Sequence, residues 1–349
     1  MEVLQTPQEF IRAVSQRKDL SRDEAALAME GIMEGQWTPA QIGAYITALL
    51  MKGESQEEIV GSAQVMRAKA FQMGVKNRPL VDPVGSGGDA LKTINVSTLS
   101  GLVAAGVGVT IAKHGNRAMT GQCGSADFLQ GLGIDLEISP AAAIRGIDEN
   151  GFGFLLAPVF HQSMKHAIGP RREIGIPTIF NHLGPLTNPV APECQFIGVN
   201  RAQNTSRFTE VLIGLGCRHS LVVHGEDGMD EITTTGSTKI VEQKDGKIES
   251  FTVTPEDFGM TRVSVSDLAL NGAEAVIEMG KAVLANDAPQ TQINLVLLNA
   301  GAVIYLGGKA KSINEGVELA RESLTSGAAG KVAEKVAAYT QKVRKEEQG

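Results

Sequence analysis

The residues with the clearest chemical potential lie in four short polar clusters, most of them directly after an apolar run. The first cluster is DPVGSGGD at 82–89, where three glycines fall within four residues. Such a run lets successive backbone amides turn toward one point, which favours an anion. It lacks the Gly-Lys-Ser/Thr of a Walker loop and the glycine spacing of a dinucleotide fingerprint. Taken alone, it fits a tight connection between a strand and a helix equally well.

Small polar side chains continue this cluster and change its interpretation. Thr93, Asn95, Ser97 and Thr98 precede an apolar helical run over 99–105. Ser97 or Thr98 can cap that helix, and the free amides of a first helical turn attract phosphate. Because an ordinary cap needs one hydroxyl, the surplus favours anion binding.

The second cluster is KHGNR at 113–117, after a run at 109–112 that is typical of a strand. Ligand sites in open α/β sheets lie beyond the carboxyl ends of strands. Lys113 offers a point charge for phosphate, and Gly115 permits close approach of a ligand. Small residues continue through Gly121 to GSAD at 124–127, where we expect a second helix to begin. A basic loop packed on surface acids is the alternative, but it does not explain the glycines.

The third cluster runs from His161 to Pro189. At helical spacing, His161 and Lys165 share a face. A structural histidine is the simpler reading of His161. An arginine fork suits a carboxylate, but the sequence leaves open whether Arg171 or Arg172 faces a ligand.

The fourth cluster, HGEDGMDE at 224–231, holds adjacent carboxylates after a predicted strand. Carboxylates in a turn are usually solvated. Beside an anion site, however, they suit Mg²⁺, which bridges carboxylates to phosphates.

The elements that must position these clusters follow two patterns. The first 70 residues predict helices, with capping boxes at Ser21, Thr38 and Ser55 and Pro39 at a first helical position. From about residue 79, β-branched runs alternate with helical stretches, which indicates an α/β domain with a largely parallel sheet. We expect strands at 80–84, 109–112, 152–156, 195–199 and 220–223, a hairpin over 242–253, and helices over 290–306, 312–324 and 331–345.

Composition excludes several classes of protein. The net charge is −7, which does not indicate the excess of positive charge that is typical of nucleic-acid-binding proteins. No apolar run approaches the roughly 20 residues of a membrane-spanning helix, and the first residues lack a secretion signal, so we expect a cytoplasmic protein. Three unclustered cysteines disfavour a disulfide framework or a zinc site.

Together the motifs resemble those of the anthranilate phosphoribosyltransferases. GSGGD (85–89), TINVST (93–98), KHGNR, GSAD, the 161–189 stretch and MDE (229–231) occur in that order along essentially the whole chain. KHGNR and TIFNHLGPLTNP (178–189) are highly specific, whereas GSGGD alone also fits the related pyrimidine nucleoside phosphorylases.

The resemblance implies a nucleoside-phosphorylase-like α/β fold with two domains. A small all-helical domain over 1–75, joined by helices from about 160–185, would meet a larger α/β phosphoribosyl-binding domain over 76–349 that has a mostly parallel central sheet. The active site would lie at their hinge, and the helical domains would form a homodimer. The implied activity transfers the phosphoribosyl group of 5-phosphoribosyl 1-pyrophosphate (PRPP) to the amine of anthranilate, the second step of tryptophan synthesis from chorismate.

The resemblance also implies site residues, with no single catalytic acid or base. The PRPP ligands would be Gly85, Gly88, Asp89, Thr93, Asn95, Val96, Ser97, Thr98, Lys113, His114, Gly115, Asn116, Arg117, Thr120, Gly121 and Ser125. The anthranilate site would comprise Gly85, Asn116, His161 and Arg171. Two Mg²⁺ ions would be held by Ser97, Asp230 and Glu231.

The sequence departs from the family pattern at four places: Ser86, Asp82-Pro83, Thr120-Gly121 and Gly169-Pro170. Each of the first three keeps a hydroxyl or a flexible backbone, so we expect altered affinity rather than lost activity. Two rivals stay open. One is a pyrimidine nucleoside phosphorylase, which the acidic pair and Arg171 disfavour; the other is a non-catalytic nucleic-acid-binding relative, which the acidic composition and intact KHGNR disfavour.

Overall fold

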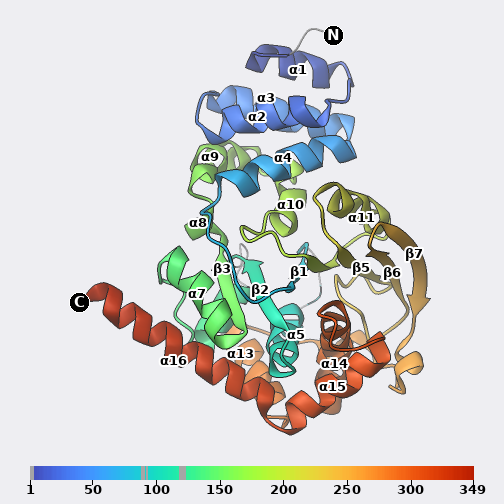
Figure 1. The fold of residues 1–349 in the computed structure, drawn as a ribbon. Coiled ribbons are helices and arrows are strands. Elements are labelled where there is room, and N and C mark those ends of the chain that lie inside the picture. The colour runs from blue at the N-terminus through green and yellow to red at the C-terminus, as the bar shows by residue number, and fades with distance from the viewer. Residues whose placement is uncertain (1–3, 88–90, 92, 118–122) are drawn as a thin grey trace.

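The protein has a helical part and a part built around one sheet (Figure 1). The structure, a computed structural model, describes residues 4–87, 91, 93–117 and 123–349. Within these residues no helix is both long enough and apolar enough to cross a membrane.

The N-terminal helices begin where their capping residues predict. The helical bounds are α1 Pro7–Ser15, α2 Arg22–Met33, α3 Pro39–Lys52 and α4 Gln56–Lys69. The boxes at Ser21, Thr38 and Ser55 are confirmed: each hydroxyl accepts a hydrogen bond from the N3 amide while the N3 side chain accepts one from the cap amide. A fourth box, Thr6 with Glu9, opens α1.

A later segment of the chain returns to these helices. Its elements are α8 Ala157–Phe160, η1 Gln162–Met164, α9 Lys165–Ile174, α10 Ile179–Leu183 and η2 Gly184–Leu186. Ala167, Phe180 and Leu183 are buried in one apolar cluster with the side chains of α1–α4. The cluster extends to Val84 and Ile197 of the sheet, so the helical part and one sheet face share a core.

The sheet has seven strands in the order β3-β2-β1-β4-β5-β6-β7. Their bounds are β1 Leu80–Gly85, β2 Thr110–Gly115, β3 Phe152–Leu156, β4 Cys194–Gly198, β5 His219–Gly225, β6 Thr238–Lys244 and β7 Lys247–Val253. The first five pair in parallel, and β6 and β7 add an antiparallel hairpin. The predicted turn is confirmed, since Asp245 and Gly246 have φ of 49° and 82°. The mostly parallel sheet is therefore confirmed, although β6 begins four residues before the predicted hairpin.

The remaining helices surround the sheet (Figure 1). They are α5 Val96–Gly106, α6 Ser125–Gly131, α7 Pro140–Asn150, α11 Asn204–Gly214, η3 Pro255–Phe258, α12 Val265–Leu268, α13 Ala273–Leu284, α14 Gln290–Leu306, α15 Ile313–Thr325 and α16 Ala328–Gln348. Helix α11 packs against α4 and β5, whereas α14 packs against α5, α15 and the strands β1, β4 and β5. Residues 295–298 of α14 are all fully buried, as expected for a helix that is apolar on every side and lies inside a core.

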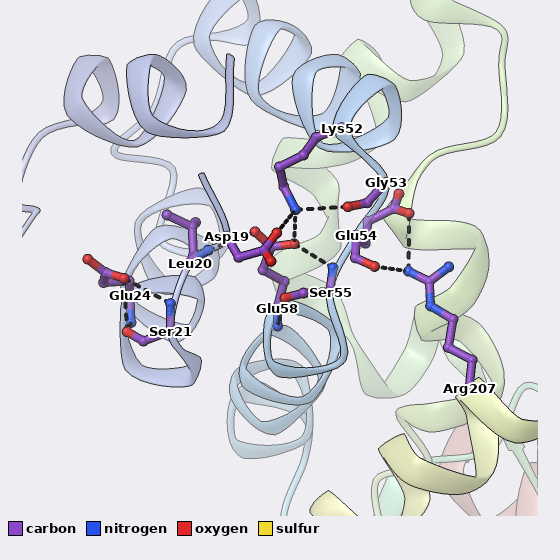
Figure 2. Close-up of polar contacts among 10 residues, drawn as sticks. All are labelled: Asp19, Leu20, Ser21, Glu24, Lys52, Gly53, Glu54, Ser55, Glu58 and Arg207. Atoms are coloured by element: carbon purple, nitrogen blue, oxygen red, sulfur yellow. Dashed lines mark hydrogen bonds and ion pairs between the residues drawn. The ribbon is translucent and has the colours of Figure 1, made fainter. Parts of the chain in front are cut away.

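A buried polar cluster connects the loop between α3 and α4 to its neighbours (Figure 2). Glu58 accepts hydrogen bonds from the backbone amides of Leu20 and Ser55, at 2.9 and 2.7 Å, and from Lys52 Nζ at 2.9 Å. On the other side of the loop, Glu54 pairs with Arg207 of α11 at 3.4 Å. The cluster fixes this loop to the α1–α2 connection and to the α/β part.

Candidate active site

The candidate site lies at the carboxyl ends of β1, β2 and β4. Strand β1 lies between β2 and β4, so the chain leaves β1 toward one edge of the sheet and later returns on its other side. The crevice at such a switch point is where ligands bind in open α/β sheets. These strands and the adjacent β5 end at Gly85, Gly115, Gly198 and Gly225.

The glycine loop after β1 meets the predicted acidic pair. The Gly87 amide donates to Asp230 Oδ2 at 2.9 Å, and the Ser86 amide donates to the Gly198 carbonyl at 2.8 Å. A Cβ at Gly85 would lie 2.5 Å from Asp230 Oδ2, and one at Gly198 would lie 1.5 Å from the Asp230 carbonyl oxygen. The two strand ends therefore accept Asp230 only because both residues are glycine.

Asp230 and Glu231 are each 7% exposed, so they are not the solvated turn that the sequence also allowed. The described residues contain no group of three or more His, Cys, Asp or Glu side chains arranged for a metal. A buried carboxylate pair beside a glycine loop nevertheless fits Mg²⁺, which commonly takes one or two protein carboxylates and completes its shell with waters and phosphate oxygens.

Lys113 connects the second cluster to the first. Its Nζ donates to Ser97 Oγ at 3.1 Å and to the Pro83 carbonyl at 2.6 Å, and the residue is 1% exposed. Burial lowers the pKa of Lys113, while the carboxylates of Asp82, Glu231 and Asp230 oppose that shift. An ammonium this deep, surrounded by acids, is placed to meet an anionic ligand.

Helix α5 begins earlier than predicted, and the expected cap by Ser97 or Thr98 is wrong. Its N-cap is Asn95, which makes no side-chain capping bond. Ser97 instead accepts from Lys113, and Thr98 Oγ1 donates to Asn95 Oδ1 at 3.0 Å. Tertiary contacts thus draw the hydroxyls into the first turn, leaving its amides without a side-chain cap.

The Gly124-Ser125-Ala126-Asp127 segment does start a helix, as predicted. Helix α6 begins at Ser125, and the Gly124 amide donates to Asp127 Oδ2 at 3.1 Å. Asn95 Nδ2 donates to the Cys123 carbonyl at 2.8 Å, so this loop lies against the TINVST segment.

Two buried histidines face each other at the end of β2. The rings of His114 and His161 are 5.2 Å apart, edge to face. Burial, and then the neighbouring His161, lower the pKa of His114 to about 3, and burial also lowers the pKa of His161. Both rings are therefore neutral near pH 7. The Nε2 atoms of both are buried without a hydrogen-bond partner among the described residues. The backbone at Gly184, for His114, and at Thr187 and Met66, for His161, opposes the lowering of these pKa values. Each Nε2 is an acceptor for an N–H group in the tautomer that carries its proton on Nδ1.

The predicted helical face shared by His161 and Lys165 is wrong. The His161 backbone, at φ −113° and ψ 60°, is not helical, and it separates α8 from η1, so Lys165 starts a different helix. The break turns His161 inward, where it is 5% exposed.

Burial distinguishes the two arginines between which the sequence left the choice open. Arg171 is half-buried in α9, with its guanidinium 5.0 Å from the ring centre of Phe180, whereas Arg172 is exposed. Burial lowers the pKa of Arg171. Arg171 thus faces the protein and Arg172 the solvent.

Other candidate residues fall into three groups. Thr93, Gly115 and Ser125 are partly buried at the strand and helix ends, and Val96 places its side chain in the core, which leaves only its backbone for a ligand. Arg117 points to the α6 surface, where it pairs with Asp127 at 3.4 Å, and Asn116 is exposed. Gly88, Asp89, Thr120 and Gly121 lie outside the described residues.

Two polar residues that sequence reasoning did not assign lie directly beneath this site. Asp82 and Asn188 are fully buried, and Asn188 Nδ2 donates to Asp82 Oδ2 at 2.8 Å. The available signal was an aspartate inside a run that otherwise predicts a buried strand.

Comparisons with known proteins agree with this architecture. Residues 8–70 match the helical bundle domain of the glycosyl transferase family, and residues 77–330 match its a/b domain. The chain is 50% identical over 315 residues to the anthranilate phosphoribosyltransferase of Desulfotalea psychrophila, covering 89% of this chain and 90% of the relative. It is 45% identical over 346 residues to that of Trichlorobacter lovleyi, covering 95% and 98%.

Solved structures give the same result. Anthranilate phosphoribosyltransferase from Thermus thermophilus matches with a TM-score of 0.90 and 39% identity, covering 95% of this chain and 99% of that one. The Saccharomyces cerevisiae protein in complex with PRPP and Mg matches with a TM-score of 0.86 and 26% identity, covering 96% and 98%.

Proposed function

Because this chain belongs to the anthranilate phosphoribosyltransferases of the glycosyl transferase family, we propose that it transfers the phosphoribosyl group of PRPP to the amine of anthranilate. The products are N-(5-phosphoribosyl)anthranilate and pyrophosphate, in the second step of tryptophan synthesis. The observation that carries the proposal is convergence: the Gly87 amide meets Asp230, 143 residues away, and Lys113 of β2 meets Ser97 of α5.

The donor binds where the glycine loop, the start of α5 and the carboxyl end of β2 come together. The first turn of α5, which has no side-chain cap, and the Lys113 ammonium supply the positive potential that a diphosphate needs. The other residues that the motif match assigns to PRPP are its remaining ligands in this proposal; Gly88, Asp89, Thr120 and Gly121 among them lie outside the described residues.

Magnesium is held by Ser97, Asp230 and Glu231, with two ions in each site. When bound, Mg²⁺ neutralises charge on the leaving pyrophosphate and serves as a template. Buried Asp230 and Glu231 support this assignment, because their charges would repel a diphosphate without a cation between them. Titration of Mn²⁺ into the protein with PRPP, followed by electron paramagnetic resonance, gives the number of ions.

Anthranilate binds beside Gly85, Asn116 and His161, and Arg171 receives its carboxylate. The buried His161 Nε2, which has no hydrogen-bond partner among the described residues, and the position of Arg171 over Phe180 support this assignment. The amine nitrogen forms a bond with C1 of the ribose while the C1–O bond breaks, and the electron pair leaves with pyrophosphate. The nitrogen then releases a proton to water. An aromatic amine already has a free lone pair, so positioning and leaving-group stabilisation are the main contributions of the protein.

The helical domain, residues 1–75 with about 160–185, forms a homodimer. Apolar side chains exposed on its helices support this, among them Leu27 at 46%, Met51 at 70% and Ile168 at 53%. Light scattering of the purified protein measures the mass, and a monomer at micromolar concentration contradicts the dimer.

One assay tests the activity. The protein is mixed with Mg²⁺, PRPP and anthranilate, and the loss of anthranilate fluorescence is followed. We expect turnover that requires Mg²⁺ and that falls strongly in the Asp230→Asn/Glu231→Gln double variant. No turnover by the wild type refutes the proposal; phosphate-dependent cleavage of thymidine or uridine indicates a nucleoside phosphorylase instead, and tight, salt-sensitive DNA binding without turnover indicates a non-catalytic relative.

A further inference from the structure

The sheet is incomplete beneath the candidate site. Strand β1 pairs with β4 over five residues from Val81 to Gly85, but it pairs with β2 only at Leu80 and Val81. Strand β2 itself continues in register with β3 from Ile111 to Gly115. The neighbours β1 and β2 therefore separate just where both approach the site.

Extending the observed register shows which hydrogen bonds are missing. Because Val81 is opposite Ile111, two residues further Pro83 would be opposite Lys113. In a parallel pair, the Pro83 nitrogen would then donate to the Ala112 carbonyl, and the Pro83 carbonyl would accept from the His114 amide. Proline has no N–H, so it cannot make the first of these bonds.

Three side chains instead bond the Ala112 carbonyl, the His114 amide and the Pro83 carbonyl. Asn188 Nδ2 donates to the Ala112 carbonyl at 2.7 Å. Asp82 Oδ1 accepts from the His114 amide at 3.1 Å, and Lys113 Nζ donates to the Pro83 carbonyl at 2.6 Å. Asp82 Oδ2 also accepts from Asn188 Nδ2, so the two side chains support each other.

We propose that Asp82 and Asn188 are positioning residues that hold β1 and β2 apart, so that the Lys113 ammonium lies between the strands and reaches Ser97. The inference rests on the proposed function, since it concerns how the donor site is built. With a continuous ladder, the His114 amide would bond the Pro83 carbonyl, and the backbones of β1 and β2 would be too close for the Lys113 side chain to lie between them. Asp82 also supplies a buried negative charge beside that cation.

A purely structural role for the pair is the alternative, because any buried polar group needs partners. The two roles differ in their kinetic consequences. A structural tie stabilises the fold without altering substrate constants, whereas a positioning tie sets the location of Lys113 and so acts on PRPP.

Three variants of the pair separate these roles. Asp82→Asn keeps an oxygen for the His114 amide but turns its Nδ2 toward Asn188 Nδ2, donor against donor. Asn188→Asp sets two carboxylates against each other. The double variant Asp82→Asn/Asn188→Asp again places a donor opposite an acceptor. Only the Ala112 carbonyl then lacks its hydrogen-bond donor.

Glu193→Gln is the matched control. Glu193 Oε2 accepts from the Leu80 amide at 2.9 Å, so it is also a carboxylate bonded to the sheet backbone, but at the far end of β1. It is expected to lower thermal stability and to keep the kinetic constants of the wild type.

We expect each single variant to lose kcat/KM for PRPP on the order of 10²-fold, the cost of a misplaced binding group. The kcat/KM for PRPP of the double variant should be about tenfold higher than that of Asn188→Asp, because the repulsion between the two carboxylates is removed. PRPP affinity measured by calorimetry should follow the same order. Unchanged constants in folded single variants, or a double variant no better than Asn188→Asp, overturn the inference. A wild type that neither turns over nor binds PRPP overturns the proposed function, and the inference with it.

Discussion

Two capping boxes with the same spacing differ in burial, and this difference predicts unequal costs for the same substitution (Figure 2). Glu58 and Glu24 are both N3 residues that accept from the amide of their cap, Ser55 or Ser21. Glu58 is fully buried and also receives the Leu20 amide and Lys52. Glu24 is partly exposed. We therefore expect Glu58→Gln to destabilise the protein far more than Glu24→Gln.

The size of the stability loss in Glu58→Gln follows from the buried groups that lose their charged partner. Removing one partner of a buried ion pair costs about 3–5 kcal/mol. Burial opposes the charge of Lys52, but hydrogen bonds to Asp19 and Glu58 outweigh it and raise its pKa. In the variant Lys52 keeps Asp19 at 2.6 Å and the Gly53 carbonyl at 2.8 Å, which favours the lower end, about 3 kcal/mol.

The control variant Glu24→Gln should lose much less stability. Glutamine also serves at N3 of a capping box, and the Glu24 pair with Lys18 is long, at 3.9 Å, and partly exposed. A cost of about 0.5 kcal/mol is expected.

Thermal unfolding and hydrogen exchange measure both effects. A loss of about 3 kcal/mol lowers Tm by roughly 5 °C or more, against about 1 °C for the control. Exchange should accelerate at the Leu20 and Ser55 amides in Glu58→Gln, because their acceptor is weakened. Equal Tm shifts for the two variants, or unchanged protection of these amides, would refute the reasoning.

Three further predictions concern the site. The pKa of His114 is lowered to about 3, so the folded state binds fewer protons than the unfolded state from about pH 6.5 down to 3. Stability should therefore decrease as the pH is lowered across that window, by about 5 kcal/mol in total, and His114→Gln should flatten this decrease in a denaturant series at several pH values. Arg171→Ala should raise KM for anthranilate by roughly thirtyfold or more, the equivalent of about 2 kcal/mol, with little change for PRPP. Arg172→Ala is its exposed control, and equal losses for both substrates would indicate a structural role. Gly198→Ala should cost activity on the order of 10²-fold, because the new Cβ would lie 1.5 Å from the Asp230 carbonyl; a fully active variant in steady-state assays contradicts the packing argument.

Local signals predicted the elements well where one stretch of chain settles the outcome. The boxes at Ser21, Thr38 and Ser55 start helices because the cap and its N3 partner are three residues apart. The β-branched runs form strands for a similar reason. A short apolar run of this kind favours a buried strand whichever strands lie beside it. The alternation of runs also predicted the parallel order of the sheet.

Predictions that depended on distant partners failed or could not be made. Ser97 resembled a cap, but its hydroxyl accepts a hydrogen bond from the Lys113 ammonium of strand β2. His161 resembled a helical residue, but the chain breaks there so that the ring can meet His114. Asn188 and Asp82 are 106 residues apart, and nothing in either local sequence shows that they meet.

The glycines near the site have a further role that the sequence did not suggest. Runs of glycine predicted amides that turn toward an anion, yet the Gly87 amide donates to Asp230, a side chain of the protein itself. Gly85 and Gly198 likewise serve to admit that residue between two strand ends. The glycine loop therefore positions an acidic side chain as well as offering space for a ligand. If Asp230 holds a cation, the loop, the cation and the diphosphate depend on the same close packing, so substitutions at either glycine should weaken cation and donor binding together.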